Sequence, residues 1–256
     1  MTDSEAASLS PQPAAVVLVH GAWHGAWCWQ PVMDRLRTAG VKAFACDLPG
    51  HGSDPGPFGD LHQDAARVRD LLDTLEPPVV LVGHSYGGAV ITEAGDHGSV
   101  AYLVYLAALA LDRDESCLNA AAGEAQAAII SHEGRPDLGA GLVPGPDDTV
   151  SLDRSIAAQC LYEDCDDETT GWALDRLGAQ PLITLQQTPD AVAWRTRSST
   201  YVVCANDLTV HPALQRLLAS RCTTRVEWDC GHSPFLSHPA LVADLLTELA
   251  TDARST

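Results

Sequence analysis

Six short apolar runs, rich in β-branched residues, constrain the fold of this 256-residue chain more than any other feature. Most of them are separated by segments whose apolar residues recur at helical spacing. A continuous apolar run is typical of a strand buried on both faces, and strands that alternate with helices are joined in parallel by right-handed crossovers. The pattern therefore predicts an α/β fold with an open, mostly parallel sheet of about six strands flanked by helices. The predicted strands are residues 14–19, 41–46, 78–83, 100–106, 199–205 and 223–228.

This rhythm is interrupted between residues 112 and 195. The segment contains helical fragments broken by turn signals such as GLVPGPDD, and no run in it predicts a strand. We interpret it as a helical cap inserted over the carboxyl edge of the sheet. The core is then expected at 14–111 and 196–256, and a flexible tail at 1–13, where the chain is polar and rich in Ser and Pro.

The charge balance limits the expected partners. Lys and Arg number 15 and Asp and Glu 34, so the formal net charge is −19. Such a charge repels nucleic acid phosphates and anionic lipid, so neither nucleic acid nor a membrane is an expected partner. The first residues lack the basic and apolar regions of a secretion signal, and the apolar run 100–111 is too short to cross a bilayer. We therefore expect a cytoplasmic protein.

The eight cysteines show no CxxC spacing, and without an export signal we expect reduced, buried thiols. Cys160 and Cys165 are close enough in the sequence to pair or to bind a metal. Without a second matching pair, however, they supply at most half of a zinc site.

A serine motif follows the third predicted strand. GHSYGG, residues 83–88, is a G-x-S-x-G sequence between a strand and a helix, and chemistry in an open α/β sheet takes place at the carboxyl ends of its strands. Such a turn is strained, lifts the serine hydroxyl away from the backbone, and leaves room only for hydrogen at Gly83 and Gly87. The motif predicts that Ser85 is a nucleophile.

A possible acid and base follow the last two predicted strands. Asp207 comes after the fifth strand and His232 after the sixth, which gives the chain order Ser, Asp, His. In this arrangement His232 takes the proton of Ser85 and returns it to the leaving group, while Asp207 holds the imidazole in the required tautomer. Asp112 and Asp114, which follow the fourth strand, are the alternative acids.

On these residues the chain resembles the α/β-hydrolase superfamily over nearly its whole length after residue 13. The resemblance rests on VLVHGAW, DLPGHGSD, GHSYGG, NDLTVHP and CGHSPF. HGAWHGAWCW and ANDLTVHPALQR resemble more narrowly the branch of plant methylesterases, salicylate-binding esterases and hydroxynitrile lyases, with its bacterial relatives. The resemblance implies an α/β-hydrolase fold and an oxyanion hole formed by the backbone N–H groups of Ala22 and Tyr86.

Two positions distinguish esterases from cyanohydrin lyases in this branch. By the resemblance, the lyases carry Thr where this chain has Gly21, and Lys directly after the catalytic His, where it has Ser233. That Lys supplies a positive charge that manages cyanide, and Ser cannot supply it. Both departures favour ester hydrolysis.

The stretch HGAWHGAWCW, residues 20–29, raises the question of a metal site. Its two histidines lie four residues apart, but the glycines at 21 and 25 argue against a helix, so we expect no metal there and no cofactor elsewhere. Trp23 is a candidate for the wall of the substrate pocket, as is Trp172 in the cap. His24, Trp27 and Trp29 are expected to pack and to hold the loop in place.

The sequence therefore predicts a carboxylesterase-type serine hydrolase. It would cleave small to medium, largely uncharged carboxylic esters through an acyl-enzyme on Ser85. Two alternatives remain on the same scaffold: a lyase or cofactor-free reaction with His232 as base, and a ligand receptor with slow turnover. Nothing in the sequence predicts an oligomeric state.

Overall fold

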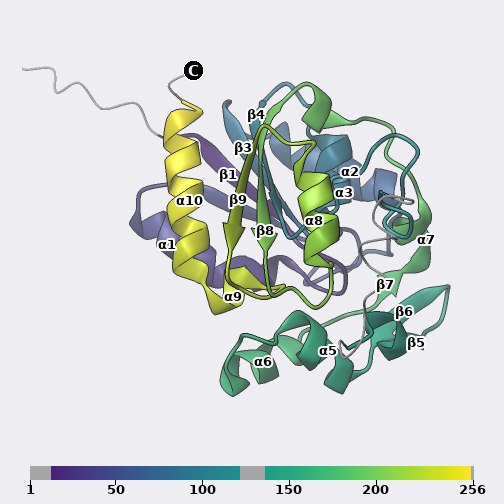
Figure 1. Ribbon diagram of the computed structural model, residues 1–256. Helices are drawn as coiled ribbons and strands as arrows, with labels where there is room; N and C mark the ends of the chain where they lie inside the picture. The colour runs from purple at the N-terminus through teal and green to yellow at the C-terminus, as the bar shows by residue number, and fades with distance from the viewer. Residues whose placement is uncertain (1–12, 122–135, 255–256) are drawn as a thin grey trace, which may run out of the picture.

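The structure is a computed structural model that describes residues 13–121 and 136–254 (Figure 1). Apart from Pro13, the tail expected at residues 1–13 lies outside the described residues, as does the part of the expected cap between 122 and 135.

The centre of the molecule is a six-stranded, all-parallel sheet with the strand order β2-β1-β3-β4-β8-β9. Each strand coincides with one of the six apolar runs, so the predicted α/β-hydrolase sheet is confirmed. β1 lies between β2 and β3, so the strand order reverses there, and ligands of open α/β sheets bind outside the carboxyl ends at such a reversal. The strands are β1 (Ala15–Val19), β2 (Ala43–Cys46), β3 (Val79–His84), β4 (Val100–Leu106), β8 (Ser198–Cys204) and β9 (Thr224–Trp228).

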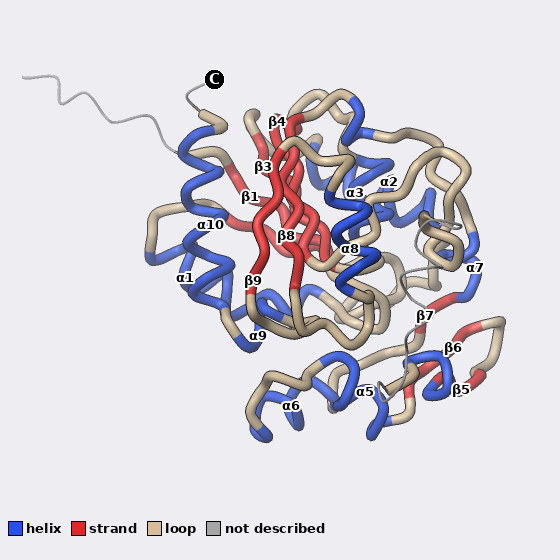
Figure 2. The backbone as a smooth tube through the Cα atoms, viewed as in Figure 1, coloured by secondary structure: helices blue, strands red, loops and turns tan. Residues whose placement is uncertain are grey.

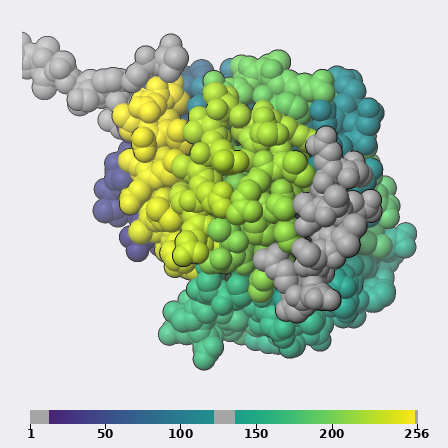
Figure 3. Space-filling model, viewed as in Figure 1, coloured from purple at the N-terminus to yellow at the C-terminus, as the bar shows by residue number. Residues whose placement is uncertain are grey.

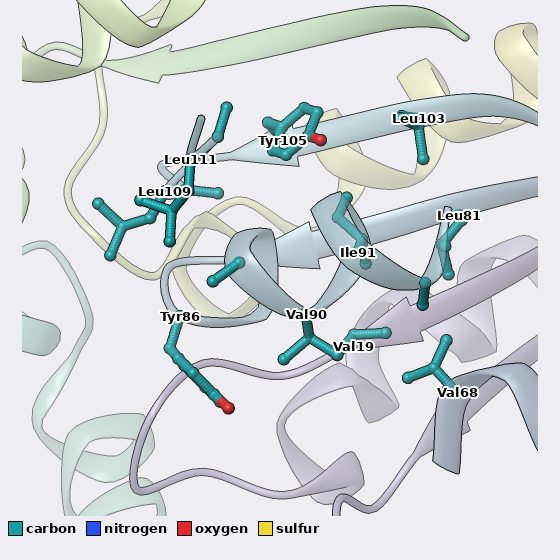
Figure 4. Packing of buried hydrophobic residues seen from close by; sticks show 14 of the residues in the cluster. Val19, Val68, Leu81, Tyr86, Val90, Ile91, Leu103, Tyr105, Leu109 and Leu111 are labelled. Atoms are coloured by element: carbon teal, nitrogen blue, oxygen red, sulfur yellow. The ribbon is translucent and has the colours of Figure 1, made fainter. Parts of the chain in front are cut away.

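Helices cover both faces of the sheet (Figure 2). Successive strand residues point to opposite faces, so Val16 and Leu18 of β1 join one core cluster while Val17 and Val19 join the other. The first cluster packs against α1 (Gln30–Thr38), α9 (Pro234–Ser237) and α10 (Pro239–Asp252). The second, part of which is drawn in Figure 4, packs against α2 (Leu61–Leu72), α3 (Gly87–Ala94) and α8 (Pro212–Ala219).

The segment between β4 and β8 packs against the end of the core where these strands finish (Figures 1 and 3). It contains the expected helices but also a three-stranded antiparallel sheet, β5-β6-β7, so the expectation of no strand between 112 and 195 is wrong. These strands are two to four residues long and carry no apolar run, so their backbone pairing left no pattern in the sequence. The elements of this segment are η2 (Leu138–Gly141), β5 (Leu142–Pro144), β6 (Thr149–Leu152), α5 (Arg154–Leu161), α6 (Asp167–Leu174), β7 (Gln180–Pro181), α7 (Leu182–Gln186) and η3 (Ala193–Arg195), where η marks a short 3-10 helix. A further 3-10 helix, η1 (Ala26–Trp29), precedes α1.

Within the described ranges, no helix has both the length and the apolar character that crossing a bilayer requires. All eight cysteines belong to these ranges and each is a free thiol, including Cys160 and Cys165.

Candidate active site

Ser85 occupies the tight turn between β3 and α3. Its φ of +51° lies in the left-handed region, which costs a residue with a side chain on the order of 1–3 kcal/mol. The turn is fixed on both sides: the Ser85 N–H donates to the Leu106 carbonyl (3.3 Å), and the Ser85 carbonyl accepts from Gly88 and Leu109 (3.0 Å each). In the fully described segment 79–95, Ser85 is the one residue that is not buried. The turn therefore leaves the Ser85 side chain partly exposed.

Glycine is required around the serine because backbone passes so close. A Cβ on Gly83 would lie 2.4 Å from the Gly87 carbonyl oxygen, and one on Gly87 would lie 2.6 Å from that of His20. The prediction that these two positions leave room only for hydrogen is confirmed. A Cβ on Gly21 would lie 3.0 Å from Cβ of Ser85, so the loop after β1 lies directly against the serine turn.

Asp207 and His232 form a buried pair beyond β8 and β9. His232 Nδ1 lies 2.8 Å from Asp207 Oδ2, and both side chains are buried. Asp207 Oδ1 accepts hydrogen bonds from the N–H groups of Thr209 (2.7 Å) and Val210 (2.9 Å), which fixes the carboxylate. Because Asp207 Oδ2 is an acceptor and faces Nδ1, the imidazole keeps its proton on Nδ1, and its Nε2 is able to accept a proton.

The alternative acids lie elsewhere. Asp112 forms two hydrogen bonds with Arg195 (2.6 and 2.7 Å), and Asp114 is exposed. Of the acids considered from the sequence, the structure therefore brings Asp207 to His232.

Charge around His232 opposes the effect of its burial. Burial alone would lower the pKa of the imidazole, but the carboxylates of Asp207, Glu163 and Asp164 raise it above its ordinary value. These groups favour a proton on the ring, which is the state a general base reaches when it accepts the serine proton.

The serine turn and the histidine loop are joined through His84. Its Nε2 lies 2.9 Å from the carbonyl oxygen of His232, and the two imidazole rings are 4.6 Å apart between centroids. Because a carbonyl only accepts, Nε2 of His84 carries the proton. Ser85 is thereby held at the same edge of the sheet as His232 and Asp207.

Ala22 and Tyr86 supply backbone N–H groups near the serine. Tyr86 follows Ser85 and caps α3, while Ala22 follows the glycine that lies against Ser85 (Figure 4 shows Tyr86 at the turn). Within the described chain, neither N–H has a hydrogen-bond partner. Two unpaired donors beside a serine are what stabilisation of an oxyanion requires.

The histidines of the 20–29 stretch hold the loop after β1. His20 Nδ1 lies 2.8 Å from the Gly21 carbonyl while its Nε2 accepts from Leu48 N–H (3.2 Å), and His24 contacts the Ala22 carbonyl and the Tyr162 hydroxyl (2.8 Å each). Burial lowers the pKa of His20 to about 3 and that of His24 to about 4, so both rings are neutral near pH 7. Both nitrogens of each ring are engaged, which agrees with a structural role.

The two tryptophans expected at the pocket wall have different surroundings. Trp23 is buried between the β1 loop and the inserted segment, where its Nε1 donates to the Val150 carbonyl (3.1 Å) and its N–H donates to Gln180 Oε1 (3.2 Å). Trp172 lies against the Trp27 ring, and the guanidinium of Arg176 stacks on its ring.

One group of side chains in the described residues has the spacing of metal ligands. His62, Glu93 and Asp190 each offer an atom within 4.8 Å of the others. His62 Nδ1 lies 3.0 Å from Glu93 Oε2, which also accepts from the Asp190 N–H, and Arg69 lies 3.7 Å from the same carboxylate. These contacts already compensate the charges, so the group is explained as an ion-pair network.

Sequence reasoning missed two residues that support the site. Gln215 Nε2 donates to Asp207 Oδ2 (2.7 Å) and its Oε1 accepts from the Cys204 N–H (2.9 Å). A signal for it existed, because Gln215 falls at helical spacing among the buried residues of α8. Gln180, which holds Trp23, lies on a strand that no pattern predicted.

Comparison with known proteins finds hydrolases and esterases that are similar to this chain. Alpha/beta hydrolase nvfD of Aspergillus novofumigatus is 28% identical over 93% of this chain and 97% of its own. Methylesterase 10 of Arabidopsis thaliana is 25% identical over 91% of this chain and 90% of its own. The crystal structure of a pyrethroid hydrolase from Sphingobium faniae JZ-2 superposes with a TM-score of 0.78 at 22% identity, covering 93% of this chain and 97% of that one.

A model of the alpha/beta hydrolase family matches residues 16–245. This range includes every strand of the parallel sheet except the first residue of β1, and it includes the three loops that carry Ser85, Asp207 and His232. With plant methylesterases and a bacterial esterase among its relatives, the chain belongs to the alpha/beta hydrolase family.

Proposed function

We propose that the protein is a serine hydrolase that cleaves carboxylic esters through an acyl-enzyme on Ser85. The observation that carries the proposal is the strained, accessible Ser85 at the sheet edge where a buried His232–Asp207 pair also lies. In the proposed reaction Ser85 Oγ attacks the ester carbonyl while His232 Nε2 takes its proton and then delivers it to the departing alkoxide. Water, activated by the same imidazole, hydrolyses the acyl-enzyme.

The developing negative charge is assigned to the N–H groups of Ala22 and Tyr86. Loss of one such donor in other enzymes costs on the order of 3 kcal/mol of transition-state stabilisation. Asp207 stabilises the imidazolium and keeps the imidazole tautomer, because its Oδ2 accepts from Nδ1.

The proposed substrates are small to medium, largely uncharged esters, and the proposed location is the cytoplasm. A plant methylesterase and a bacterial esterase among the similar proteins support ester substrates. The net charge of −19 disfavours polyanionic substrates, and the eight free thiols agree with a reducing compartment.

Two buried positions favour hydrolysis over cyanohydrin cleavage. A side chain at Gly21 would meet His84 Nδ1 at 2.8 Å, so the threonine of the lyases would not fit without displacing the serine turn. Ser233 is fully buried, and its hydroxyl has no partner among the described residues. A lysine there would have to bury its ammonium group, which is costly without a paired anion.

The test combines labelling and turnover. We expect a fluorophosphonate to label Ser85, and Ser85→Ala to lower kcat/KM on a methyl-ester and nitrophenyl acetate panel by about a thousandfold or more. Ser220→Ala, an exposed serine at the end of α8, is the matched control and should retain full activity. Wild-type turnover by Ser85→Ala would refute the proposal, and release of a carbonyl compound without an acid would favour the lyase alternative. Tight ligand binding without turnover would favour the receptor.

A further inference from the structure

The end of α5 and the turn that follows it contact three loops at the proposed active site, those that carry Asp207, Ala22 and His232. The Cys160 carbonyl accepts from Thr209 Oγ1 in the Asp207 loop (2.7 Å), and the Tyr162 hydroxyl lies 2.8 Å from His24 Nε2 in the loop that carries Ala22. The third contact, to the His232 loop, is made by the next two residues, Glu163 and Asp164.

These two carboxylates bind consecutive backbone N–H groups of the histidine loop. Asp164 Oδ2 accepts from Gly231 N–H at 2.7 Å, and Glu163 Oε1 accepts from His232 N–H at 3.2 Å. Asp164 Oδ2 also accepts from Ser237 Oγ at 3.0 Å, where α9 ends. The contact is tight, because a Cβ on Gly231 would lie 2.5 Å from Glu163 Oε1. Two anchors on adjacent peptide groups fix the backbone from which the imidazole extends.

Each carboxylate keeps one oxygen that backbone anchoring does not use. Glu163 Oε2 and Asp164 Oδ1 are buried and have no hydrogen-bond partner within the described ranges. A buried carboxylate oxygen without a partner is costly, and such a cost is typically retained at functional sites. The nearby group that gains positive charge during the proposed reaction is His232.

We propose that Glu163 and Asp164 are positioning residues for His232: they fix the backbone of its loop, and the negative charge of Glu163 stabilises the imidazolium that forms when Ser85 loses its proton. This inference rests on the proposed function. Neither residue touches the substrate in this account, since both act through His232.

The titratable groups around this contact come from several elements, and they include His238, whose Nδ1 lies 3.6 Å from Asp164 Oδ2. Those that face Glu163 are His232, Asp207, Asp164, Cys160 and Cys165. Those that face His232 are Asp207, Glu163, Asp164, His84 and His24. Burial raises the pKa of Glu163 to about 7, while His232 lowers it and Asp207 and Asp164 raise it. The charge states of Glu163 and His232 are therefore coupled: the negative carboxylate raises the pKa of the imidazole, and the imidazolium lowers the pKa of the carboxyl group.

The experiment is the pH dependence of kcat/KM for Glu163→Gln in the full chain. Glutamine keeps the shape and the acceptor oxygen but removes the charge, so we expect the acid limb to shift to lower pH by about half a unit or more, the size expected of one partly screened charge. Glu163→Asp keeps the charge and should retain the wild-type limb. Glu168→Gln, an exposed carboxylate of α6, is the matched control and should leave the profile unchanged.

A second readout does not need activity. Titration of the His232 ring resonances by NMR should show a lower imidazole pKa in Glu163→Gln than in the wild type. If both the pH profile and the NMR titration of Glu163→Gln are those of the wild type, the inference is overturned. The proposed function still stands in that case if the wild-type protein hydrolyses esters. If the protein hydrolyses no ester but the NMR pKa falls, the proposed function fails and the contact stands. Should Glu163→Gln not fold in a thermal melt, Glu163→Ala replaces it with the same expected direction, and an unshifted His232 pKa in that variant overturns the inference.

Discussion

At the scale of single residues, Asp64 places a buried carboxyl group beside the residue that follows the nucleophile. The Tyr86 hydroxyl donates to its Oδ2 at 2.5 Å, and its Oδ1 is buried without a partner in the described chain. Burial raises the pKa of Asp64 to about 7, although the Tyr86 hydrogen bond lowers it. Between about pH 4 and 7 the folded protein thus holds a proton that the unfolded chain has lost, and stability falls as the pH rises through this window.

Asp64→Asn should therefore gain stability relative to the wild type as the pH rises. The neutral amide removes the ionisation, so the difference in unfolding free energy should grow in favour of the variant by about 2 kcal/mol between pH 5 and pH 8. Urea unfolding at both values measures it. Asp70→Asn, an exposed residue of the same helix, is the matched control for the loss of a carboxylate. A constant difference for Asp64→Asn would mean that Asp64 is not protonated in the folded state.

Residues could be predicted from the sequence where their place in a strand-turn-helix pattern defined their role. Ser85, Asp207 and His232 each follow a recognisable strand, so the edge they share was predictable. Glu163 was not, because its role depends on a contact with His232 that is 69 residues away in the sequence. Whether Ala22 and Tyr86 form the oxyanion hole stays a prediction that labelling alone does not test.

At the scale of elements, the six core strands were predictable because burial on both faces requires a continuous apolar run. β6 and β7 have no such run: only part of β6 is buried, and β7 consists of Gln180 and Pro181. Their pairing is set by contacts with Trp23 and with each other, which no local pattern encodes. For the same reason the boundaries 14–111, 112–195 and 196–256 remain a proposal.

The close approach of α3 to β1 predicts how strongly glycine is needed at its first turn. In Gly87→Ala the new Cβ would meet the backbone oxygens of His20 (2.6 Å) and Val19 (2.7 Å), which cannot move without separating the two elements. We expect a loss of about 1–3 kcal/mol or more of unfolding free energy. In Gly171→Ala, inside α6, the Cβ meets nothing within 4 Å, so the helix should gain about 0.5–1 kcal/mol. Chemical denaturation of both variants measures the pair, and equal stability of Gly87→Ala and the wild type would contradict the described packing.

At the scale of the whole molecule, the proposed active site is assembled from segments that no single element contains. The serine turn, the histidine loop and the loop after β1 meet where the strand order reverses. The inserted segment contacts Trp23 of the loop after β1, and its own residues Tyr162 and Glu163 contact the loop after β1 and the histidine loop. A sequence pattern can place each loop at the end of its strand. It cannot say which residues of the inserted segment reach them, because that depends on contacts between parts of the chain that are far apart in the sequence.

The net charge of −19 and the individual ion pairs of the surface predict opposite effects of salt on stability. Exposed pairs such as Arg37–Asp34 and Arg216–Glu227 contribute little to stability, and salt weakens them. Salt also screens the repulsion among the excess carboxylates, which opposes the compact state. With more than twice as many acidic as basic side chains, repulsion should dominate, and raising NaCl from low to high concentration should raise the Tm by about 2–4 °C, equivalent to about 1 kcal/mol for a chain of this size. KCl should give the same shift because screening does not depend on the monovalent cation, and a Tm that falls with either salt would show that the ion pairs outweigh the repulsion.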